Sequence, residues 1–202
     1  MARYTGPKTK LARKVSEDLG LKTNSLKVAR RLMVRPGQHG HRGRRRLSDY
    51  GTQLQEKQKL KYLYGILEKK LQKLYSEASK NPTATGSALL SLLERRLDNV
   101  VYRLAWAPTR AAARQLVSHS HVQVNGRKMN IPSYEVKVGD VISIRDRSTK
   151  IPYVKELLAE ETGSTVAWLD KKGPAAQVSR LPVREDINER IDEQLVVEYY
   201  SR

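Results

Sequence analysis

Leucines at helical spacing mark the middle of the chain as helical. Two segments share this pattern: Leu60, Leu63, Leu67, Leu71 and Leu74 in the first, and Leu89, Leu93, Leu97, Val100 and Leu104 in the second. An apolar residue at every third or fourth position gives a helix one face that it can bury. We therefore expect a helix from Ser48 or Asp49, either of which can cap it, to about Tyr75. A second helix should end before Pro108.

A third helix leads into a hairpin. Thr109 is placed to cap an alanine-rich helix over residues 110–119. Beyond it apolar and polar residues alternate in "VQVNGRKM", residues 122–129. The Asn125-Gly126 pair predicts a two-residue turn, because both turn positions favour positive φ.

The alternation continues past this hairpin. In "YEVKVGDVISI", residues 134–144, it predicts two strands joined by a turn at Gly139-Asp140. Beyond them a helix is expected over 153–161, a strand over 166–169 and a loop over 170–177. Helices followed by short antiparallel strands predict a compact α+β unit.

The first 46 residues differ from the rest of the chain. They carry few apolar side chains and many cations, so we expect residues 1–46 to fold only against a partner. Within them, residues 26–34 can form a short basic helix that Pro36-Gly37 ends.

The best internal boundary is "SKNPTATGS", residues 79–87, which is rich in residues that break helices.

Near the end of the chain Ile187, Ile191 and Leu195 recur every four positions among acidic residues. This spacing predicts an acidic amphipathic helix, which suits contact with protein better than contact with RNA.

The charge of the chain is strongly positive and uneven. Lys and Arg total 39 against 21 Asp and Glu, a net charge of +18. Residues 1–75 hold 20 basic and 5 acidic residues, a net +15, whereas residues 76–202 hold 19 and 16, a net +3. Such self-repulsion needs a polyanion, either nucleic acid or anionic lipid. No apolar run approaches the roughly 20 residues that span a bilayer, so we expect a cytoplasmic protein.

Two histidine pairs raise the question of a metal site. Zinc takes three or four ligands, but the chain has no Cys and no carboxylate near either pair. We expect no metal and no cofactor. His119 suits a helix end, where an imidazolium is favoured, and His121 would open the first strand. His39 and His41 would meet bases or phosphates.

No catalytic motif stands out. The chain has no phosphate-binding glycine loop, no Gly-x-Ser-x-Gly and no His-Glu-x-x-His, so we expect neither an enzyme nor a small-molecule substrate. Asp98 and Asn99 lie beside Arg95, Arg96 and Arg103 and could suggest acid chemistry. Helix salt bridges explain these residues more simply.

Residues 109–129 join a basic helix face to the hairpin. Arg110 and Arg114 fall on one face of the helix, and Arg127 and Lys128 lie just past the turn. All four can converge on neighbouring phosphates of a folded RNA. Since the unit offers few aromatic residues for stacking, we expect it to recognise the shape and backbone of RNA.

Cations of the first third complete the candidate RNA-binding surface. Lys57 and Lys61 lie off the leucine face of their helix, so that face can pack while the lysines meet phosphate. Residues 42–46 form a flexible cationic strap. The whole candidate set is Arg3, Lys8, Lys10, Arg13, Arg30, Arg31, Arg35, Gln38, His39, His41, Arg42, Arg44, Arg45, Arg46, Lys57, Lys61, Arg110, Arg114, His121, Arg127 and Lys128.

One stretch resembles a known RNA-binding module. "RRLDNVVYRLAWAPTRAAARQLVSHSHVQVNGRKMNIPSYEVKVGDVISI", residues 95–144, is similar to the module named after ribosomal small-subunit protein four, which also occurs in RNA-modifying enzymes and in one class of tRNA synthetase. The flanks "MARYTGPK", "PGQHG", "RRRLSDYGTQLQEKQKLKYLYGILE" and "VVEYYSR" resemble the ribosomal family itself, bacterial or organellar in type. The likeness covers nearly the whole chain.

The resemblance implies a domain organisation that composition does not reveal. The fold would be α+β, with a mostly helical first domain of residues 47–86 completed by the C-terminal helix of residues 183–202. The small α+β module of residues 87–182 would be inserted between them, with its RNA-binding core at about 95–150. Residues 1–46 would form a basic extension that depends on RNA.

The resemblance also implies a function. Proteins of this family are primary binders of 16S-type ribosomal RNA, where they organise the five-way junction of the 5′ domain during assembly. They contact small-subunit proteins five and three and help line the channel through which messenger RNA enters, a role for which Arg44, Arg45 and Arg46 are the candidates here. We therefore expect a structural constituent of a cytoplasmic or organellar small ribosomal subunit.

The sequence differs from many members of the family in one respect, and two alternative functions were considered. Many relatives in the family hold zinc with four cysteines in the N-terminal segment, whereas residues 1–46 contain none, so we expect no zinc. An RNA-modifying enzyme would need a second, catalytic domain, for which residues 1–85 offer no motif. A transient assembly or stress factor with the same module is the other rival, and its stoichiometry in washed subunits would distinguish it.

Overall fold

The computed structural model describes residues 3–42, 46–81, 84–159 and 166–202. The chain forms two compact units, one of residues 1–89 with 189–202 and one of residues 90–188. The predicted domain boundaries stay predictions. No helix in the described ranges is both long enough and apolar enough to cross a membrane.

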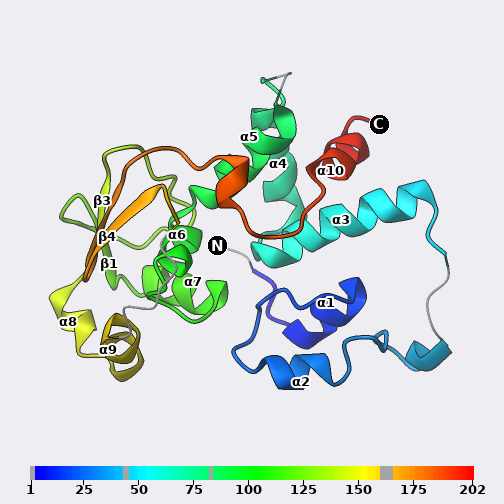
Figure 1. The fold of residues 1–202 in the computed structure, drawn as a ribbon, viewed down its shortest axis with the longest axis horizontal. Coiled ribbons are helices and arrows are strands. Elements are labelled where there is room, and N and C mark those ends of the chain that lie inside the picture. Colours follow the sequence, from blue (N-terminus) through cyan, green and yellow to red (C-terminus); the bar gives the residue numbers. More distant parts are fainter. Residues whose placement is uncertain (1–2, 43–45, 82–83, 160–165) are drawn as a thin grey trace. The chain divides into compact units, whose positions relative to one another are not determined.

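The first unit is helical (Figure 1). Its elements are α1 (Lys8–Val15), α2 (Ser25–Ala29), the short 3-10 helix η1 (Gly40–Arg42), α3 (Asp49–Leu63), α4 (Glu68–Ala78) and α10 (Glu193–Tyr200). Helix α1 contacts α3, and Leu11 and Val15 of α1 are buried. The predicted helix over 26–34 is shorter in the structure, where α2 ends at Ala29 and turns follow.

The single helix predicted from residue 48 to residue 75 is wrong, because the chain turns at Gly65. Helix α3 begins as expected, with the Ser48 hydroxyl accepting a hydrogen bond from the backbone N–H of Gly51. It ends where Gly65 adopts a φ of +60°, the left-handed conformation that glycine accommodates best. The N–H of Ile66 donates to the carbonyl of Lys61, and that of Gly65 donates to Tyr62. This is the Schellman pattern of a helix end.

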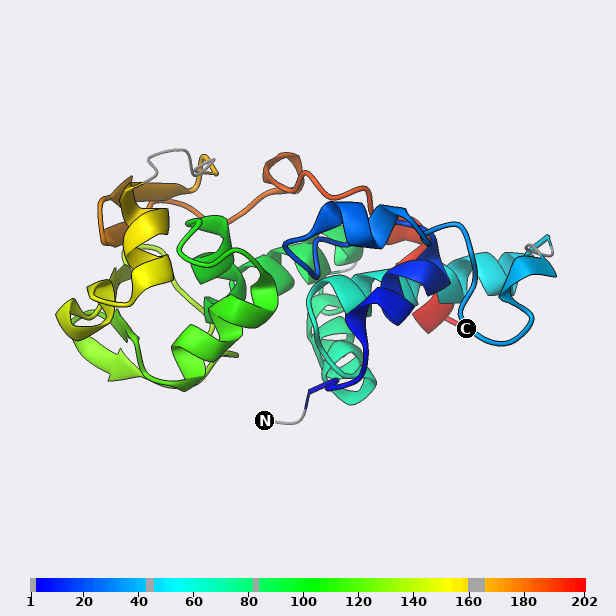
Figure 2. The same cartoon turned by 90° about the horizontal axis from the view of Figure 1, so that it is seen from below.

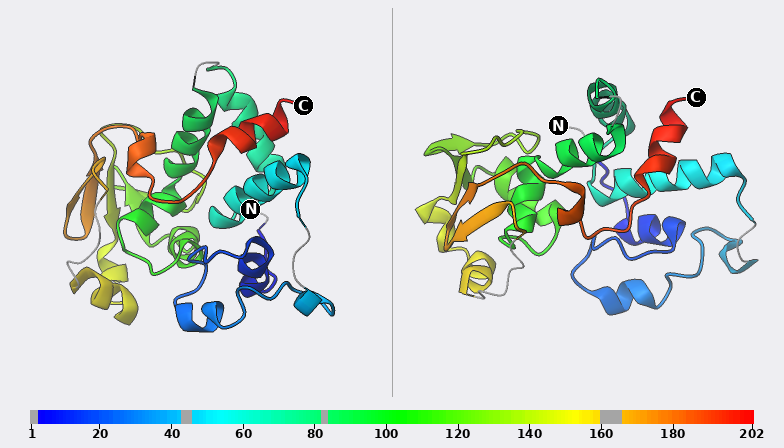
Figure 3. Two further views of the ribbon diagram at one scale, coloured as in Figure 1. Left: turned by 45° about the vertical axis from the view of Figure 1, so that its right-hand side comes forward. Right: turned by 45° about the horizontal axis from the view of Figure 1, so that its top comes forward.

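Helix α10 packs along α3 although the two are far apart in sequence (Figure 3). The amide of Gln53 donates to a carboxylate oxygen of Glu198 at 2.9 Å. The rings of Tyr75 and Tyr200 stack with their centroids 4.7 Å apart. The Tyr200 hydroxyl donates to Glu68 Oε1 at 2.8 Å. The C-terminal helix is therefore an integral part of the first unit.

The predicted C-terminal helix is longer than the one observed. Ile187 and Ile191 are buried as expected, but they follow the 3-10 helix η2 (Arg184–Asp186) and precede α10. Asp192 caps α10, since its Oδ1 accepts from the N–H groups of Gln194 and Leu195. The helix consequently begins only after this residue.

The second unit combines helices with a five-stranded antiparallel sheet, as the α+β prediction required (Figures 1 and 2). Helices α6 (Leu97–Arg103) and α7 (Arg110–Ser118) lie side by side. The strands pair in the order β2-β1-β3-β5-β4. Their bounds are β1 (Val122–Val124), β2 (Arg127–Met129), β3 (Val141–Ile144), β4 (Leu169–Lys172) and β5 (Ala175–Val178), with α8 (Asp146–Thr149) and α9 (Pro152–Ala159) after β3.

The helix predicted over Leu89 to Leu104 is broken in two. Helix α5 (Thr85–Glu94) ends and α6 begins on either side of Arg96, which has an extended ψ of 133°. There the backbone pairs with residues 134–136: the N–H of Leu97 donates to Tyr134, and that of Val136 donates to Arg95. Residues 134–138 form only this isolated bridge instead of the predicted strand.

The loop predicted over residues 170–177 is also wrong. Most of these residues belong to the β4–β5 hairpin, which turns at Gly173 with a φ of +58°. The sequence shows too little apolar alternation here for the pattern to predict strands, and pairing of β5 with β3 places the hairpin in the sheet.

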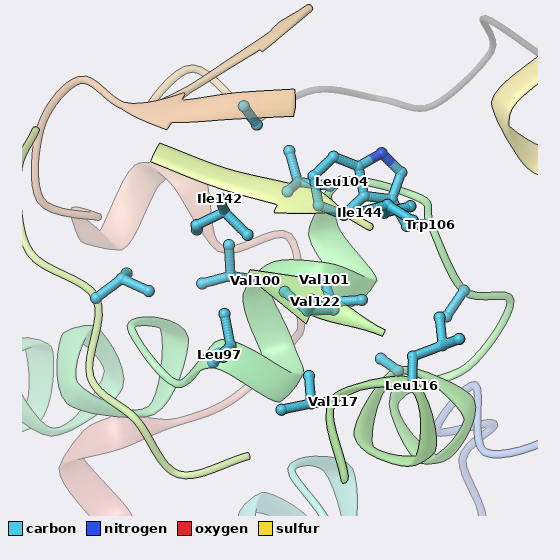
Figure 4. Packing of buried hydrophobic residues seen from close by; sticks show 14 of the residues in the cluster. Leu97, Val100, Val101, Leu104, Trp106, Leu116, Val117, Val122, Ile142 and Ile144 are labelled. Atoms are coloured by element: carbon cyan, nitrogen blue, oxygen red, sulfur yellow. The ribbon is translucent and has the colours of Figure 1, made fainter. Parts of the chain in front are cut away.

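The core of the second unit packs α6 and α7 against the sheet (Figure 4). Val100 of α6, Leu104 at the C-cap of α6 and Val117 of α7 meet Val122 of β1 and Ile142 of β3, and each of these side chains is buried. Burial of such side chains contributes roughly 1.5–3 kcal/mol each relative to exposure. The hairpin of β1 and β2 is thus anchored to the packed core that α6 and α7 form with the sheet.

Candidate nucleic-acid interface

The turn between β1 and β2 is held from outside the hairpin. Asn125 and Gly126 have φ values of +51° and +75°, which confirms the predicted turn. The Asn125 side chain donates to Asp140 Oδ1 at 2.8 Å and accepts from the N–H of Val141 at 2.9 Å. Asp140 Oδ2 also accepts from the N–H of Lys137 at 2.8 Å. These bonds fix the hairpin tip against the start of β3.

Arg127 and Lys128 are presented on this fixed turn. Both are exposed on β2, which is an edge strand of the sheet. Arg127 pairs with the buried Val124 and Lys128 with Gln123. Because successive residues of a strand point to opposite faces, the two cations flank the edge of the sheet from both sides.

Arg110 and Arg114 are buried, whereas the sequence predicted that they would be exposed together with Arg127 and Lys128. Each is only 9% exposed. The Nε of Arg110 donates to Asn99 Oδ1 at 2.9 Å, and its guanidinium lies 4.4 Å from the ring centroid of Tyr102. Arg114 pairs with Asp98 at 3.5 Å. The expectation that these arginines offer exposed charge to phosphate is therefore corrected: they bind α7 to α6.

The same region holds a buried carboxylate. Glu94 accepts two hydrogen bonds from Arg103, at 2.8 and 2.7 Å, and one from Asn99 Nδ2 at 2.7 Å. Arg96 donates to both oxygens of Asp98. These contacts confirm the interpretation of the acidic residues as salt-bridge partners rather than catalysts. They fix the end of α5 and the start of α6.

Lys57 and Lys61 are also engaged inside the protein. Both donate to Glu68, at 2.7 and 3.0 Å, and Lys57 lies 4.4 Å from the ring centroid of Tyr199. The Lys57 side chain is only 4% exposed. Lys57 is therefore covered by α4 and α10 instead of exposed as expected, and its contact with phosphate stays a prediction. Burial alone would raise the pKa of Glu68, but hydrogen bonds from both lysines and from Tyr200 hold it below 4.5.

Most candidates of the N-terminal segment do lie on the surface. The exposed ones are Arg3, Lys10, Arg30, Arg31, Arg35, Gln38, His39, His41, Arg42 and Arg46. Lys8 is half-buried, and burial followed by the charges of Arg3 and Lys22 lowers its pKa. Arg44 and Arg45 lie outside the described residues.

Arg13 has a structural role in this segment. Its Nε donates to the carbonyl of Val34 at 2.7 Å, and its Nη2 donates to the carbonyl of Arg35 at 2.9 Å. The side chain thus ties α1 to the turn that presents Arg35, and its guanidinium is already committed to the backbone.

The histidines occupy the places that the sequence indicated. His119 follows α7 as its C-cap, and His121 directly precedes β1. His121 Nδ1 lies 2.8 Å from Ser148 Oγ. No group of three or more His, Cys, Asp or Glu residues suited to a metal ion occurs in the described part of the chain.

Sequence reasoning missed two further cations next to His121. Arg145 and Arg147 follow β3, and Arg145 donates to the carbonyl of Ser120 at 3.2 Å. The signal available was the segment "VISIRDR", in which two arginines come directly after an alternating strand.

Comparison with known proteins covers both units of the chain. Residues 3–94 match the ribosomal protein S4/S9 N-terminal domain, and residues 95–142 match the S4 domain. Proteins called small ribosomal subunit protein uS4 from Parabacteroides distasonis and Chloroflexus aurantiacus are 50% identical to this chain over 204 and 208 residues. The one from Bacteroides thetaiotaomicron is 48% identical over 204 residues. Each alignment covers 100% of both proteins.

Proposed function

This chain belongs to the small ribosomal subunit protein uS4 family, and on that premise we propose how it works as an RNA-binding constituent of the small ribosomal subunit. Members of this family are structural ribosomal proteins, so the prediction of a non-enzymatic ribosomal protein is confirmed. The proposal concerns which surfaces meet the RNA and what their contact achieves.

The braced hairpin is the observation that carries the proposal. Arg127 and Lys128 stand exposed beside a turn that Asp140 and Asn125 hold in place. A cation on a fixed backbone loses less conformational freedom when it meets a phosphate than one on a mobile loop. Each contact also releases counterions from the RNA. The hairpin therefore acts as a preformed phosphate clamp.

The exposed cations of the first unit supply a second contact region. Residues 1–75 carry a net charge of +15, and arginines such as Arg30, Arg31 and Arg35 are exposed. Phosphate contacts fix orientation and carry little sequence information. The chain would therefore recognise a folded junction by its shape, using two separate cationic surfaces.

The finer roles are proposed from the family resemblance. The chain binds the 5′-domain junction of 16S-type RNA, organises it during assembly, and contacts small-subunit proteins five and three. Arg44, Arg45 and Arg46, of which Arg46 lies in the described ranges and is exposed, help line the channel through which messenger RNA enters. With these roles the protein would work in ribosomes of the cytoplasm or of an organelle.

Salt dependence of binding tests the proposal. The association constant for a transcript of the small-subunit 5′ domain should fall linearly on a logarithmic plot against salt concentration. A random duplex of equal length should bind more weakly at every salt concentration. A flat salt response, or equal affinity for both RNAs, would contradict the proposal.

The transient assembly or stress factor is the alternative function. Such a factor would be lost when subunits are washed at high salt, whereas a resident protein stays at one copy per subunit. Quantitative mass spectrometry of washed subunits separates the two.

A further inference from the structure

Four side chains that can carry positive charge gather where α7 passes into β1. The ring centroids of His119 and His121 lie 6.1 Å apart. Arg145 holds the segment between them, since its N–H donates to the carbonyl of His121 at 3.0 Å and its guanidinium donates to the carbonyl of Ser120. Arg147 follows on α8. His119 and Arg147 are exposed, and His121 is half-buried.

His121 has a fixed orientation in this cluster. Its Nδ1 lies 2.8 Å from the hydroxyl of the buried Ser148. One ring nitrogen is therefore engaged with α8, and the other, Nε2, points away from this bond. In the tautomer whose Nδ1–H donates to Ser148, the imidazole can gain a proton at Nε2 without changing this bond.

The free protein disfavours the charged form of His121. Burial lowers the pKa of His121 below its usual 6.5, and the positive charges of His119, Arg145 and Arg147 lower it further. Asp146 is the nearest acidic residue along the chain to these arginines, and it is exposed at the start of α8. Burial and the surrounding residues His119, Arg145 and Arg147 thus all disfavour the charged form of His121 in the free protein.

We propose that His119, His121, Arg145 and Arg147 form a binding site for one backbone phosphate of the RNA, and that His121 takes up a proton when this site is filled. The inference rests on the proposed function, because it assumes that the partner is RNA. A phosphate among these groups reverses the local field: the repulsion between His121 and its cationic neighbours is offset, and an anion next to an imidazole favours its protonated form. The site therefore binds phosphate more tightly as pH falls.

The pH window follows from the two states of His121. Below its pKa in the free protein, the imidazole is charged before and after binding, and affinity no longer changes with pH. Between that value and the higher pKa in the complex, binding takes up one proton. In this range the association constant rises by up to about tenfold for each unit by which the pH falls.

Nuclear magnetic resonance of the wild-type full chain tests the site directly. The Cε1–H signal of His121 is followed against pH in the free protein, with inorganic phosphate, and with the 5′-domain transcript. We expect the pKa of His121 to lie below 6.5 in the free protein and above it with the transcript. A shift with the transcript alone identifies the RNA backbone as the source of the phosphate, and a shift with inorganic phosphate at low millimolar concentration identifies a general phosphate site. An unchanged pKa in the RNA complex overturns the proposal.

Affinity measurements with variants give a second test. His121→Asn keeps a group that can bond to Ser148 but cannot gain a proton. Gln72→Asn, at an exposed side chain of α4 with no assigned role in RNA binding, is the control. Between pH 8 and pH 6 the association constant should rise about three- to tenfold more for the wild type and for Gln72→Asn than for His121→Asn.

The failures of this inference and of the proposed function are distinguishable. Identical pH profiles for all three proteins, with tight RNA binding, would overturn the proton-linked site and leave the proposed function intact. Failure of the wild type to bind the transcript at any pH would overturn both.

Discussion

Neutralising the two cations of the braced hairpin should reduce the salt dependence of RNA binding by a defined amount. The double variant Arg127→Gln/Lys128→Gln removes two exposed charges beside the β1–β2 turn. Each phosphate contact contributes about 0.7–0.9 to the slope of log affinity against log salt. If both residues contact phosphate, the slope should fall by about 1.4–1.8, and the affinity gap between wild type and variant should shrink about tenfold between 50 and 200 mM salt.

A matched control separates this contact from a general effect of net charge. Lys171 and Lys172 lie beside the turn of the β4–β5 hairpin at the opposite end of the sheet order. The variant Lys171→Gln/Lys172→Gln removes the same charge, and it should leave the slope nearly unchanged. Fluorescence anisotropy with a labelled 5′-domain transcript between 50 and 200 mM potassium chloride measures all three proteins.

The single variants locate the RNA relative to the sheet. Because Arg127 and Lys128 point to opposite faces of β2, an RNA that grips the strand edge should lose about half of the slope change with each substitution. An RNA lying on one face should respond to only one of them. An equal reduction of slope by the two double variants would refute the hairpin as a specific clamp. Neither pair lies in the core, so unfolding free energies should change by less than about 0.5 kcal/mol.

Three further predictions concern the interactions that hold the fold. Asp140→Ala leaves the amide of Asn125 without its acceptor and should lower the unfolding free energy by about 1–3 kcal/mol in urea titrations; an unchanged midpoint would contradict the brace. Glu94→Gln removes the charge of the buried carboxylate that accepts two hydrogen bonds from Arg103 and should cost about 3–5 kcal/mol, seen as a lower Tm; a loss under 1 kcal/mol would contradict this contribution. The pKa of Glu68 is held below 4.5 in the folded protein, so its stabilising effect is present above pH 4.5 and is lost as pH falls below it. The difference in urea midpoint between wild type and Glu68→Gln should therefore shrink between pH 6 and pH 3, and a constant difference would exclude this linkage.

Local features of the sequence predicted local structure well. The Thr109 cap, the Ser48 cap and the Asn125-Gly126 turn depend on residues within a few positions of each other, so their chemistry can be read from the sequence. The α+β class followed from the change between helical and alternating spacing. Gly65 itself was visible in the sequence and could have indicated the end of a helix. The leucine spacing continues on both sides of it, however, and we gave that pattern more weight.

Whether a cationic side chain is exposed or buried depends on residues that are distant in the sequence. Lys57 is covered because Tyr199 and Glu68 pack over it, and Arg110 is covered by Tyr102 and Asn99. Helical spacing shows which face a residue occupies, but it does not show whether another element lies on that face. The sequence alone therefore could not predict which cations are buried beside a carboxylate, and the structure was needed to show it.

The packing of α10 on α3 sets the order in which a nascent chain can mature. Gln53 and Glu198 are 145 positions apart, so at roughly 5–20 residues per second the second partner is synthesised roughly 7 to 30 seconds after the first. Residues 90–188 are contiguous and can complete their own core in the meantime. The first unit is thus completed only after the second has been synthesised, and termination of synthesis before α10 would leave an intact second unit attached to an incomplete first one.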